Sequence, residues 1–218
     1  MKDAPDYELI ADGLAFSEGP VVMADGSVIV VELAGGRVTR CWGDRKETVC
    51  ETGGGPNGAA IAPDGSLYIC NSGGLDLEKF GNRTGPGSEG RVERIDLSTG
   101  RFERVCDACG DHPFSAPNDL VFAADGGLWF TDLGKRYGRL SELGGLYHLS
   151  ADGNTVTAID GAALSYNGVG LSPDGRTVYV ADTFQARVYA FDAQVIAAQT
   201  SRLVGTAQGK VGFDSLAV

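Results

Sequence analysis

The sequence predicts an all-β fold, a β-propeller, and three observations support this prediction. Glycine contributes 33 of the 218 residues, which suits many tight turns between short strands. Four segments share one pattern of polar, apolar and Asp-Gly positions, and Asp-Gly between apolar runs predicts a β-hairpin. The segments follow one another at about the length of a propeller blade, roughly 40 to 50 residues.

Each repeat begins with a polar residue, continues through a small-apolar run to Asp-Gly, and ends in a β-branched or aromatic run. The segments are SEGPVVMADGSVIVVE from Ser17, PNGAAIAPDGSLYICN from Pro56, PNDLVFAADGGLWFTD from Pro117 and YNGVGLSPDGRTVYVAD from Tyr166. The polar residues are Glu18, Asn57, Asn118 and Asn167, and the turn aspartates that follow each of them seven residues later are Asp25, Asp64, Asp125 and Asp174. We therefore expect four equivalent hairpins.

Further strand candidates lie between the hairpins and complete the blades. GRVTRCW, GRVERIDLSTG, GGLYHLSADG and ARVYAFD are predicted third strands, and RFERVC is a predicted fourth strand. A Gly-rich, polar segment over residues 72–90 is long for a blade connection. We expect it to form a flap over one face of the propeller.

The spacing of the repeats separates a propeller from other all-β folds. The polar positions, with Asp214 counted as the last, lie 39, 61, 49 and 47 residues apart. A solenoid of parallel strands would show shorter periods and fewer hairpins, and a sandwich would not repeat one frame four times.

The expected organisation is a single β-propeller domain over residues 1–218, with about four blades and the first strand of a fifth. The final segment, GFDSLAV, puts Asp214 in the polar position, and its Asp-Gly would fall beyond Val218. We expect a C-terminally truncated piece of a six-bladed propeller. Four blades closed by the last strand are the less favoured alternative.

Composition limits the partners and the compartment. The net charge of −11 repels phosphate backbones and anionic membranes, so neither nucleic acid nor a membrane is an expected partner. An odd number of cysteines, five, and the lack of a signal-peptide pattern favour a cytoplasmic location. CDAC, from Cys106 to Cys109, lacks the second pair that a structural zinc site usually needs, and we interpret it as two thiols in a connecting loop. No pattern in the chain predicts an oligomeric state.

The repeat frame also predicts a metal site. First strands of propeller blades lie nearest the central channel, so the five polar residues, Glu18, Asn57, Asn118, Asn167 and Asp214, should converge near the axis. All of them offer carbonyl or carboxylate oxygen. Two carboxylates in a narrow channel repel each other, and a dication balances their charge. All-oxygen ligation favours Ca²⁺. Mg²⁺ and Mn²⁺ are less suited alternatives, and Zn²⁺ usually requires His or Cys.

At these residues the chain resembles the senescence-marker-protein/gluconolactonase/luciferin-regenerating-enzyme family of six-bladed propellers. The motifs are SEGPV, PNDLVF, YNGVGLSPDG and FDSLAV; the last departs from the family's usual Pro-Asp-Gly. The resemblance implies that Glu18, Asn167 and Asp214 hold the cation. It implies that Asn118 is a further ligand or a substrate contact, and that Asn57 contacts substrate or supports the ligands.

The resemblance further implies hydrolysis of a lactone, such as the lactone of a sugar acid. The cation would polarise the ring carbonyl, and Asp214 would act as a base or as a nucleophile. Asp119 is the alternative base and a candidate substrate contact, although turn statistics alone favour a solvated carboxylate. Asp132 and Asp182, which end second strands, are expected to bond turn backbone, and His112 is expected in a surface loop.

Two alternative functions remain open from the sequence. Diisopropyl-fluorophosphatases have a similar ligand set, so a phosphotriester or fluorophosphate hydrolase is the first alternative. The second is a non-catalytic binding propeller whose ion is only structural.

Overall fold

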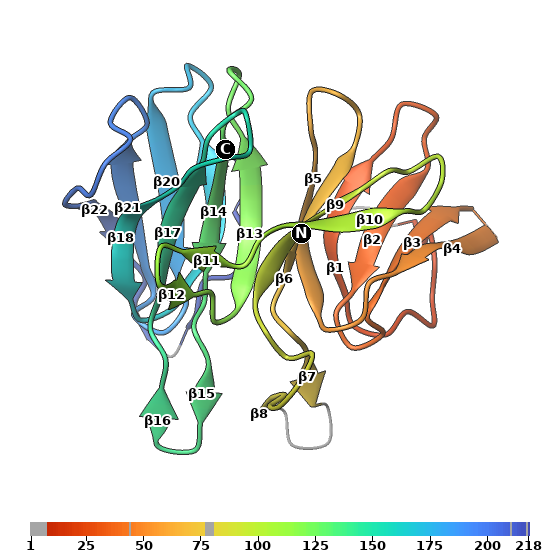
Figure 1. Ribbon diagram of the computed structural model, residues 1–218, viewed down its shortest axis with the longest axis horizontal. Helices are drawn as coiled ribbons and strands as arrows, with labels where there is room; N and C mark the ends of the chain where they lie inside the picture. The colour runs from red at the N-terminus through yellow and green to blue at the C-terminus, as the bar shows by residue number, and fades with distance from the viewer. Residues whose placement is uncertain (1–7, 44, 77–80, 210, 217) are drawn as a thin grey trace, which may run out of the picture.

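A computed structural model of the chain describes residues 8–43, 45–76, 81–209, 211–216 and 218. In these residues the regular structure is all β, and they contain no helix long and apolar enough to cross a membrane. Four four-stranded antiparallel sheets follow one another along the chain. Figure 1 shows the first two sheets in one half of the molecule and the last two in the other half. The predicted all-β propeller architecture is confirmed.

The strands of each sheet are consecutive except where a small hairpin intervenes. The first sheet contains β1 (Ser17–Val22), β2 (Val28–Glu32), β3 (Arg37–Trp42) and β4 (Arg45–Glu51). The second contains β5 (Pro56–Ile61), β6 (Leu67–Asn71), β9 (Arg91–Ile95) and β10 (Phe102–Cys106). The third contains β13 (Pro117–Phe122), β14 (Leu128–Asp132), β17 (Gly144–Leu149) and β18 (Val156–Ala163). The fourth contains β19 (Tyr166–Leu171), β20 (Thr177–Asp182), β21 (Arg187–Asp192) and β22 (Arg202–Thr206).

Three two-stranded hairpins stand apart from these sheets. They are β7 (Leu75–Asp76) with β8 (Gly81–Asn82), β11 (Ala108–Cys109) with β12 (His112–Pro113), and β15 (Arg136–Tyr137) with β16 (Leu140–Ser141).

The Asp-Gly turns form as the sequence predicts. Asp25 Oδ1 accepts hydrogen bonds from the backbone nitrogen and the hydroxyl of Ser27, at 3.1 and 2.6 Å. Gly26 between them has a φ of 81°, which a residue with a side chain rarely adopts. The other three repeats have the same arrangement, with an aspartate oxygen accepting the backbone N–H two residues on. These turns set the register of each first and second strand.

The first strand of each sheet forms its inner edge. β1 lies beside β5, β5 beside β13, and β13 beside β19. The sheets pack face to face, so the core consists of layers between neighbouring sheets. These layers are built on Ile29, Val31, Leu67 and Ile69, then on Cys70, Leu120, Phe130 and Tyr147, and then on Trp129, Leu146, Val178 and Val180. Burying each large apolar side chain contributes about 1.5–3 kcal/mol.

The last residues of the second strands are buried and polar: Glu32, Asn71, Asp132 and Asp182. Asp132 accepts the backbone N–H groups of Ser115, just before β13, and of Gly134, just after β14, at 2.7 and 2.8 Å. Asp182 accepts the backbone N–H of Gln185 at 2.9 Å. The predicted role of Asp132 and Asp182 in bonding turn backbone is confirmed. These contacts fix the chain at the end of the sheet where the first strand begins.

Two of the small hairpins project from that same end. β7–β8 follows β6 and β15–β16 follows β14, and Figure 1 shows both at the lower edge of the molecule. Asn71 at the end of β6 pairs with Pro56, and Asp132 at the end of β14 pairs with Pro117. The hairpins therefore leave the sheets next to the starts of β5 and β13. The described part of the predicted flap, residues 72–90, lies there.

The segment expected as the first strand of a fifth blade has the position of such a strand without its pairing. The Gly168 backbone nitrogen donates to the Asp214 carbonyl at 3.2 Å, which places the segment along β19. No described strand forms a ladder with residues 211–216, and they carry no regular strand. One backbone hydrogen bond to a neighbouring inner strand does not supply the antiparallel ladder that defines a blade.

Candidate active site

The polar residues that open the four repeats lie on adjacent inner strands. Each is the second residue of its strand: Glu18 in β1, Asn57 in β5, Asn118 in β13 and Asn167 in β19. Asp214 continues the row beside β19. Residues that are far apart in the sequence are therefore brought to one end of the inner strands, as the repeat frame predicts.

Close approach of the inner strands depends on the residue after each polar position. That residue is glycine in three repeats, at Gly19, Gly58 and Gly168. A Cβ at Gly58 would lie 2.6 Å from the Asn118 carbonyl oxygen, and one at Gly168 would lie 2.6 Å from the Asp214 carbonyl oxygen. Real Cβ atoms do not come so close to backbone. The third repeat differs, because Asp119 places a carboxylate where the others have no side chain.

The Asp119 carboxylate joins two sheets. Its Oδ2 accepts the backbone N–H of Val169, in β19, at 3.1 Å, and its Oδ1 accepts the N–H of Leu120 at 2.9 Å. Burial raises the pKa of Asp119 to about 6 in spite of these two hydrogen bonds, and the nearby Asp214 carboxylate adds to the rise. Asp119 is therefore a partly buried carboxylate bonded to backbone, whereas turn statistics favour a solvated one.

A third carboxylate belongs to the same group. The pKa of Glu18 is raised by burial, and then by the negative charges of Asp214 and Asp119. Glu18 and Asp214 are at opposite ends of the row of inner strands, yet they lie within electrostatic reach of each other. Like charges gathered in this way favour either protonation or a bound cation.

The amide of Asn167 has a fixed orientation. Its Nδ2 donates to the Thr183 hydroxyl at 3.0 Å, and that hydroxyl donates to the Phe213 carbonyl at 2.7 Å. Because the hydroxyl proton is used on Phe213, the hydroxyl accepts from Asn167, and the amide nitrogen must face it. Asn167 Oδ1 is then left buried, with no hydrogen-bond partner among the described residues. Such an acceptor costs about 1–3 kcal/mol when it stays unpaired.

The donor set fits a hard dication. Asn118 and Asn167 are buried, Glu18 and Asn57 are partly buried, and Asp214 is exposed. Carboxylate and amide oxygens of this kind suit Ca²⁺, and the unpaired Asn167 Oδ1 is an acceptor that such an ion would satisfy. The described residues contain no group of three or more His, Cys, Asp or Glu side chains placed to hold a metal. A site of the predicted kind relies on amides for part of its ligation.

The histidines and the CDAC cysteines lie away from this row. His112 is exposed in β12, as expected, and His148 packs edge-on against Trp129 with ring centroids 4.9 Å apart. Burial, and to a smaller extent the charges of Asp107 and Cys109, raise the pKa of Cys106 to about 12. A thiol with so high a pKa is a poor nucleophile and a poor metal ligand.

Two threonines that sequence reasoning missed support the site. Thr183 orients the Asn167 amide, as described above. The Thr131 hydroxyl, which is fully buried, donates to the Asn167 carbonyl and accepts the Asp119 N–H at 3.2 Å. The signal in the sequence is weak: each threonine is next to the acidic residue that ends a second strand, opposite the polar start of the first strand.

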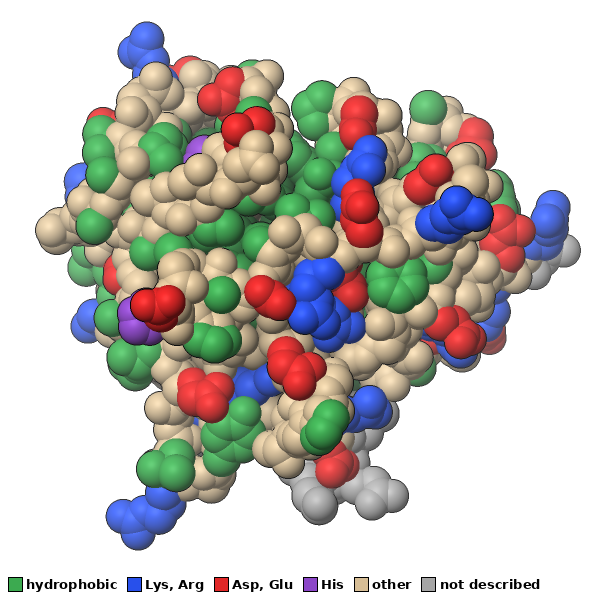
Figure 2. Space-filling view, in the orientation of Figure 1, with side chains coloured by type: hydrophobic (Ala, Val, Ile, Leu, Met, Phe, Trp, Pro, Cys, Tyr) green, Lys and Arg blue, Asp and Glu red, His purple; other side chains and the backbone are tan. Residues whose placement is uncertain are grey.

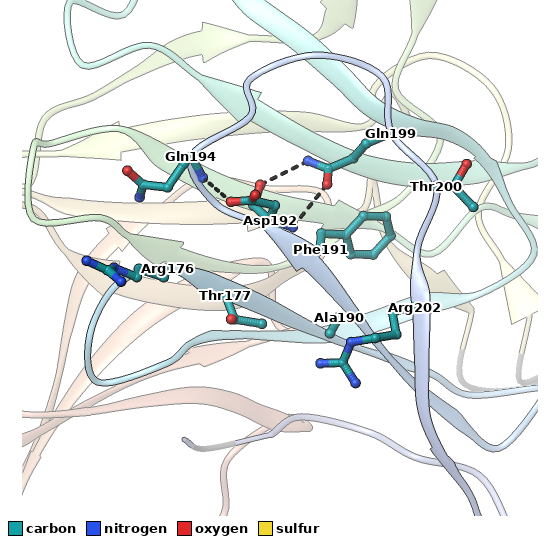
Figure 3. A pocket seen from close by; sticks show the side chains of 9 residues that line it. All are labelled: Arg176, Thr177, Ala190, Phe191, Asp192, Gln194, Gln199, Thr200 and Arg202. Carbon is teal, nitrogen blue, oxygen red and sulfur yellow. Dashed lines mark hydrogen bonds between the residues drawn. The ribbon is translucent and has the colours of Figure 1, made fainter.

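A polar depression of about 630 Å³ lies elsewhere, on the outer part of the fourth sheet. Figure 3 shows that its polar groups bond one another, with Asp192 linked to both Gln194 and Gln199. Arg176 ends the β19–β20 turn and Thr177 begins β20, at the opposite end of the sheet from Asn167. The depression therefore takes no part in the candidate site.

Comparison with known proteins shows which family shares these features. Residues 16–218 match the SMP-30/Gluconolactonase/LRE-like region. A gluconolactonase of Zymomonas mobilis is 26% identical, with 85% of this chain and 55% of that protein aligned. Lactonase drp35 of Staphylococcus epidermidis is 30% identical, with 84% of this chain and 51% of that protein aligned. The chain thus spans about half the length of the curated relatives it matches.

Solved structures support the fold. A gluconolactonase from Xanthomonas campestris superposes with a TM-score of 0.72 at 24% identity, covering 93% of this chain and 66% of that one. A calcium-binding protein, regucalcin, from Agrobacterium tumefaciens superposes with a TM-score of 0.65 at 19% identity, covering 87% of this chain and 59% of that one. At such identities the likeness concerns the fold alone.

Proposed function

Because the chain belongs to the SMP-30/gluconolactonase/LRE-like family, we propose that it is a divalent-metal-dependent lactonase that opens the lactones of sugar acids. The relatives named gluconolactonase and lactonase support the reaction class. The observation in this chain that carries the proposal is the buried, unpaired Asn167 Oδ1 beside a group of carboxylates. A bound cation would satisfy this oxygen and offset the like charges of the carboxylates.

Glu18, Asn167 and Asp214 are the proposed ligands, and Asn118 is either a further ligand or a contact to the substrate. Ca²⁺ is the proposed ion, because the donors are all oxygen. When bound, it would polarise the lactone carbonyl and stabilise the negative charge that develops on its oxygen. Asn57, which is partly buried in the next strand, is proposed to contact the hydroxyl groups of the substrate.

Either Asp214 or Asp119 is the proposed base, and Asp214 is alternatively the nucleophile. In the base mechanism the carboxylate accepts a proton from water as the water oxygen bonds to the carbonyl carbon. The bond from the carbonyl carbon to the ring oxygen then breaks, and the ring oxygen takes a proton to give the open hydroxy acid. The pKa of Asp119, about 6, suits proton transfer near neutrality, and Asp214 is accessible to water because it is exposed.

Acid release from gluconolactone at constant pH tests the proposal. We expect hydrolysis that EDTA abolishes and added Ca²⁺ restores, and that Glu18→Gln and Asp214→Asn each abolish. Asp125→Asn is the matched control, since it removes a carboxylate from a turn at the other end of β13. A chain that binds Ca²⁺ but hydrolyses no lactone contradicts the proposal. If the chain hydrolysed a phosphotriester or a fluorophosphate and no lactone, it would be a phosphotriester or fluorophosphate hydrolase, the first alternative that the sequence leaves open.

A further inference from the structure

We propose that the pocket between hairpins β7–β8 and β15–β16 binds an anionic substituent of the substrate, a carboxylate or a phosphate. This inference rests on the proposed function and narrows it to lactones that carry a negative charge away from the ring carbonyl. It depends on where the pocket lies, how its walls are held together, and which charges face it.

The pocket lies at the end of the molecule that holds the candidate active site. Its volume is about 690 Å³, and its lining includes Asp76, Asn82, Arg83, Arg136 and Tyr137. Figure 2 shows the β15–β16 hairpin as a projection at the lower left of the molecule. Both hairpins leave their sheets next to the starts of β5 and β13. A substrate held at the inner strands would therefore have its far end directed toward this rim.

Contacts between the two hairpins hold the walls of the pocket in place. The backbone nitrogen of Arg136 donates to Asn82 Oδ1 at 2.9 Å, which ties β15 to β8. At the base of the hairpins, the buried Lys135 donates its ammonium group to the Ser88 carbonyl. Walls fixed in this way reduce the entropy lost when a ligand binds.

The Arg136 guanidinium is held by a contact from the fourth sheet. It lies over the ring of Phe184, in the loop after β20, with its central carbon 4.2 Å from the ring centroid. Stacking on an aromatic face uses the face of the guanidinium and leaves N–H donors at its edge for a ligand. Arg136 is thereby kept near the pocket without its charge being neutralised.

The charges that face the pocket favour an anion. Among the described residues, no carboxylate lies within ion-pair distance of Arg83 or Arg136, whereas Arg91 binds Glu93 at 2.6 Å. Asp76 also lines the pocket. The whole chain has a net charge of −11, which repels anions. At physiological salt, charges beyond about 8 Å are largely screened. The lining therefore acts mainly through its own charges, the two guanidinium groups and the Asp76 carboxylate, which leave it net positive.

Steady-state kinetics with three lactones test the inference: gluconolactone, its 6-phosphate, and a lactone of a dicarboxylic sugar acid. Arg83→Ala and Arg136→Ala should each raise KM at least tenfold for one or both charged lactones and leave kcat within twofold. For gluconolactone, both KM and kcat should stay unchanged. The lactone that responds identifies the anion as phosphate or carboxylate. Arg136→Lys should restore KM only in part, because a lysine lacks the planar fork.

Arg139→Ala is the matched control, because Arg139 belongs to the same hairpin but does not line the pocket. Equal effects of the three alanine variants on charged and neutral lactones would overturn the inference. Binding of inorganic phosphate and of glucarate, followed by NMR titration, gives a readout independent of catalysis. If no lactone is hydrolysed, the proposed function fails while this titration still decides the pocket: saturable binding lost in Arg136→Ala supports it, and no binding refutes it.

Discussion

The Asn167 amide donates to the Thr183 hydroxyl at 3.0 Å, and this one contact decides which atom of the amide is left for a ligand. Thr183 also donates to the Phe213 carbonyl, at 2.7 Å, next to Asp214. A single hydroxyl therefore connects two of the proposed ligands. Groups that orient ligands in this way typically change metal affinity 10- to 100-fold when they are removed.

Thr183→Val should therefore weaken Ca²⁺ binding about 10- to 100-fold, because the amide can then rotate and Phe213 loses its donor. Thr183→Ser keeps the hydroxyl and should bind Ca²⁺ within about threefold of wild type. Calcium titration followed by calorimetry measures both. Equal affinities of the valine and serine variants would show that Thr183 only fills space.

Asp119→Asn should separate catalysis from metal binding. If Asp119 is the base, kcat should fall about 10²- to 10⁴-fold while the rise in melting temperature on adding Ca²⁺ is retained. Asp214→Asn should lose both activity and the calcium-dependent rise. Activity that persists in Asp119→Asn would assign the base to Asp214, and would leave Asp119 the role of linking β13 to β19 through Val169.

The repeat frame shows what a sequence of this kind can and cannot reveal. Asp-Gly turns and seven-residue spacing are local signals, and they correctly predict the hairpins and the row formed by Glu18, Asn57, Asn118 and Asn167. The burial of Asp119 has no local signal, because it results from β19 packing against β13. Thr183 was missed for the same reason: its partners are 16 and 30 residues away. Contacts between sheets depend on tertiary packing, which no single repeat encodes.

Glu32 should make stability depend on pH in the acid range. Burial alone would raise its pKa, but hydrogen bonds from Arg37, Thr39 and the Ala15 backbone outweigh burial and hold the pKa at about 2, well below the ordinary 4.5 of a glutamate. A carboxyl group with a lowered folded-state pKa stabilises the protein fully above pH 4.5 and loses this contribution as the pH falls to about 2. The shift corresponds to about 3 kcal/mol.

Urea unfolding of wild type and Glu32→Gln from pH 7 to pH 2 measures this contribution. The wild type should be more stable above pH 5, and the difference between the two proteins should shrink as the pH falls from about 4.5 to about 2. Other carboxylates titrate in both proteins and cancel in the difference. A difference that stays constant across this range would mean that Glu32 contributes through packing and not through its charge.

Adding a single methyl group at Gly58 should disturb the candidate site. A Cβ there would meet the Asn118 carbonyl oxygen and the Asp119 Cα, both at 2.6 Å. These are backbone atoms of the next inner strand, so they cannot move aside as a flexible side chain would. Gly58→Ala should therefore push β5 and β13 apart, at a cost of about 1–3 kcal/mol in unfolding free energy. It should also weaken Ca²⁺ binding, because Asn118 and Asp119 move with β13.

Gly205→Ala is the control, since a Cβ there meets nothing within 4 Å, and its stability should lie within about 0.5 kcal/mol of wild type. If Gly58→Ala lost stability but bound Ca²⁺ as wild type does, the spacing of these two strands would not be what positions the ligands.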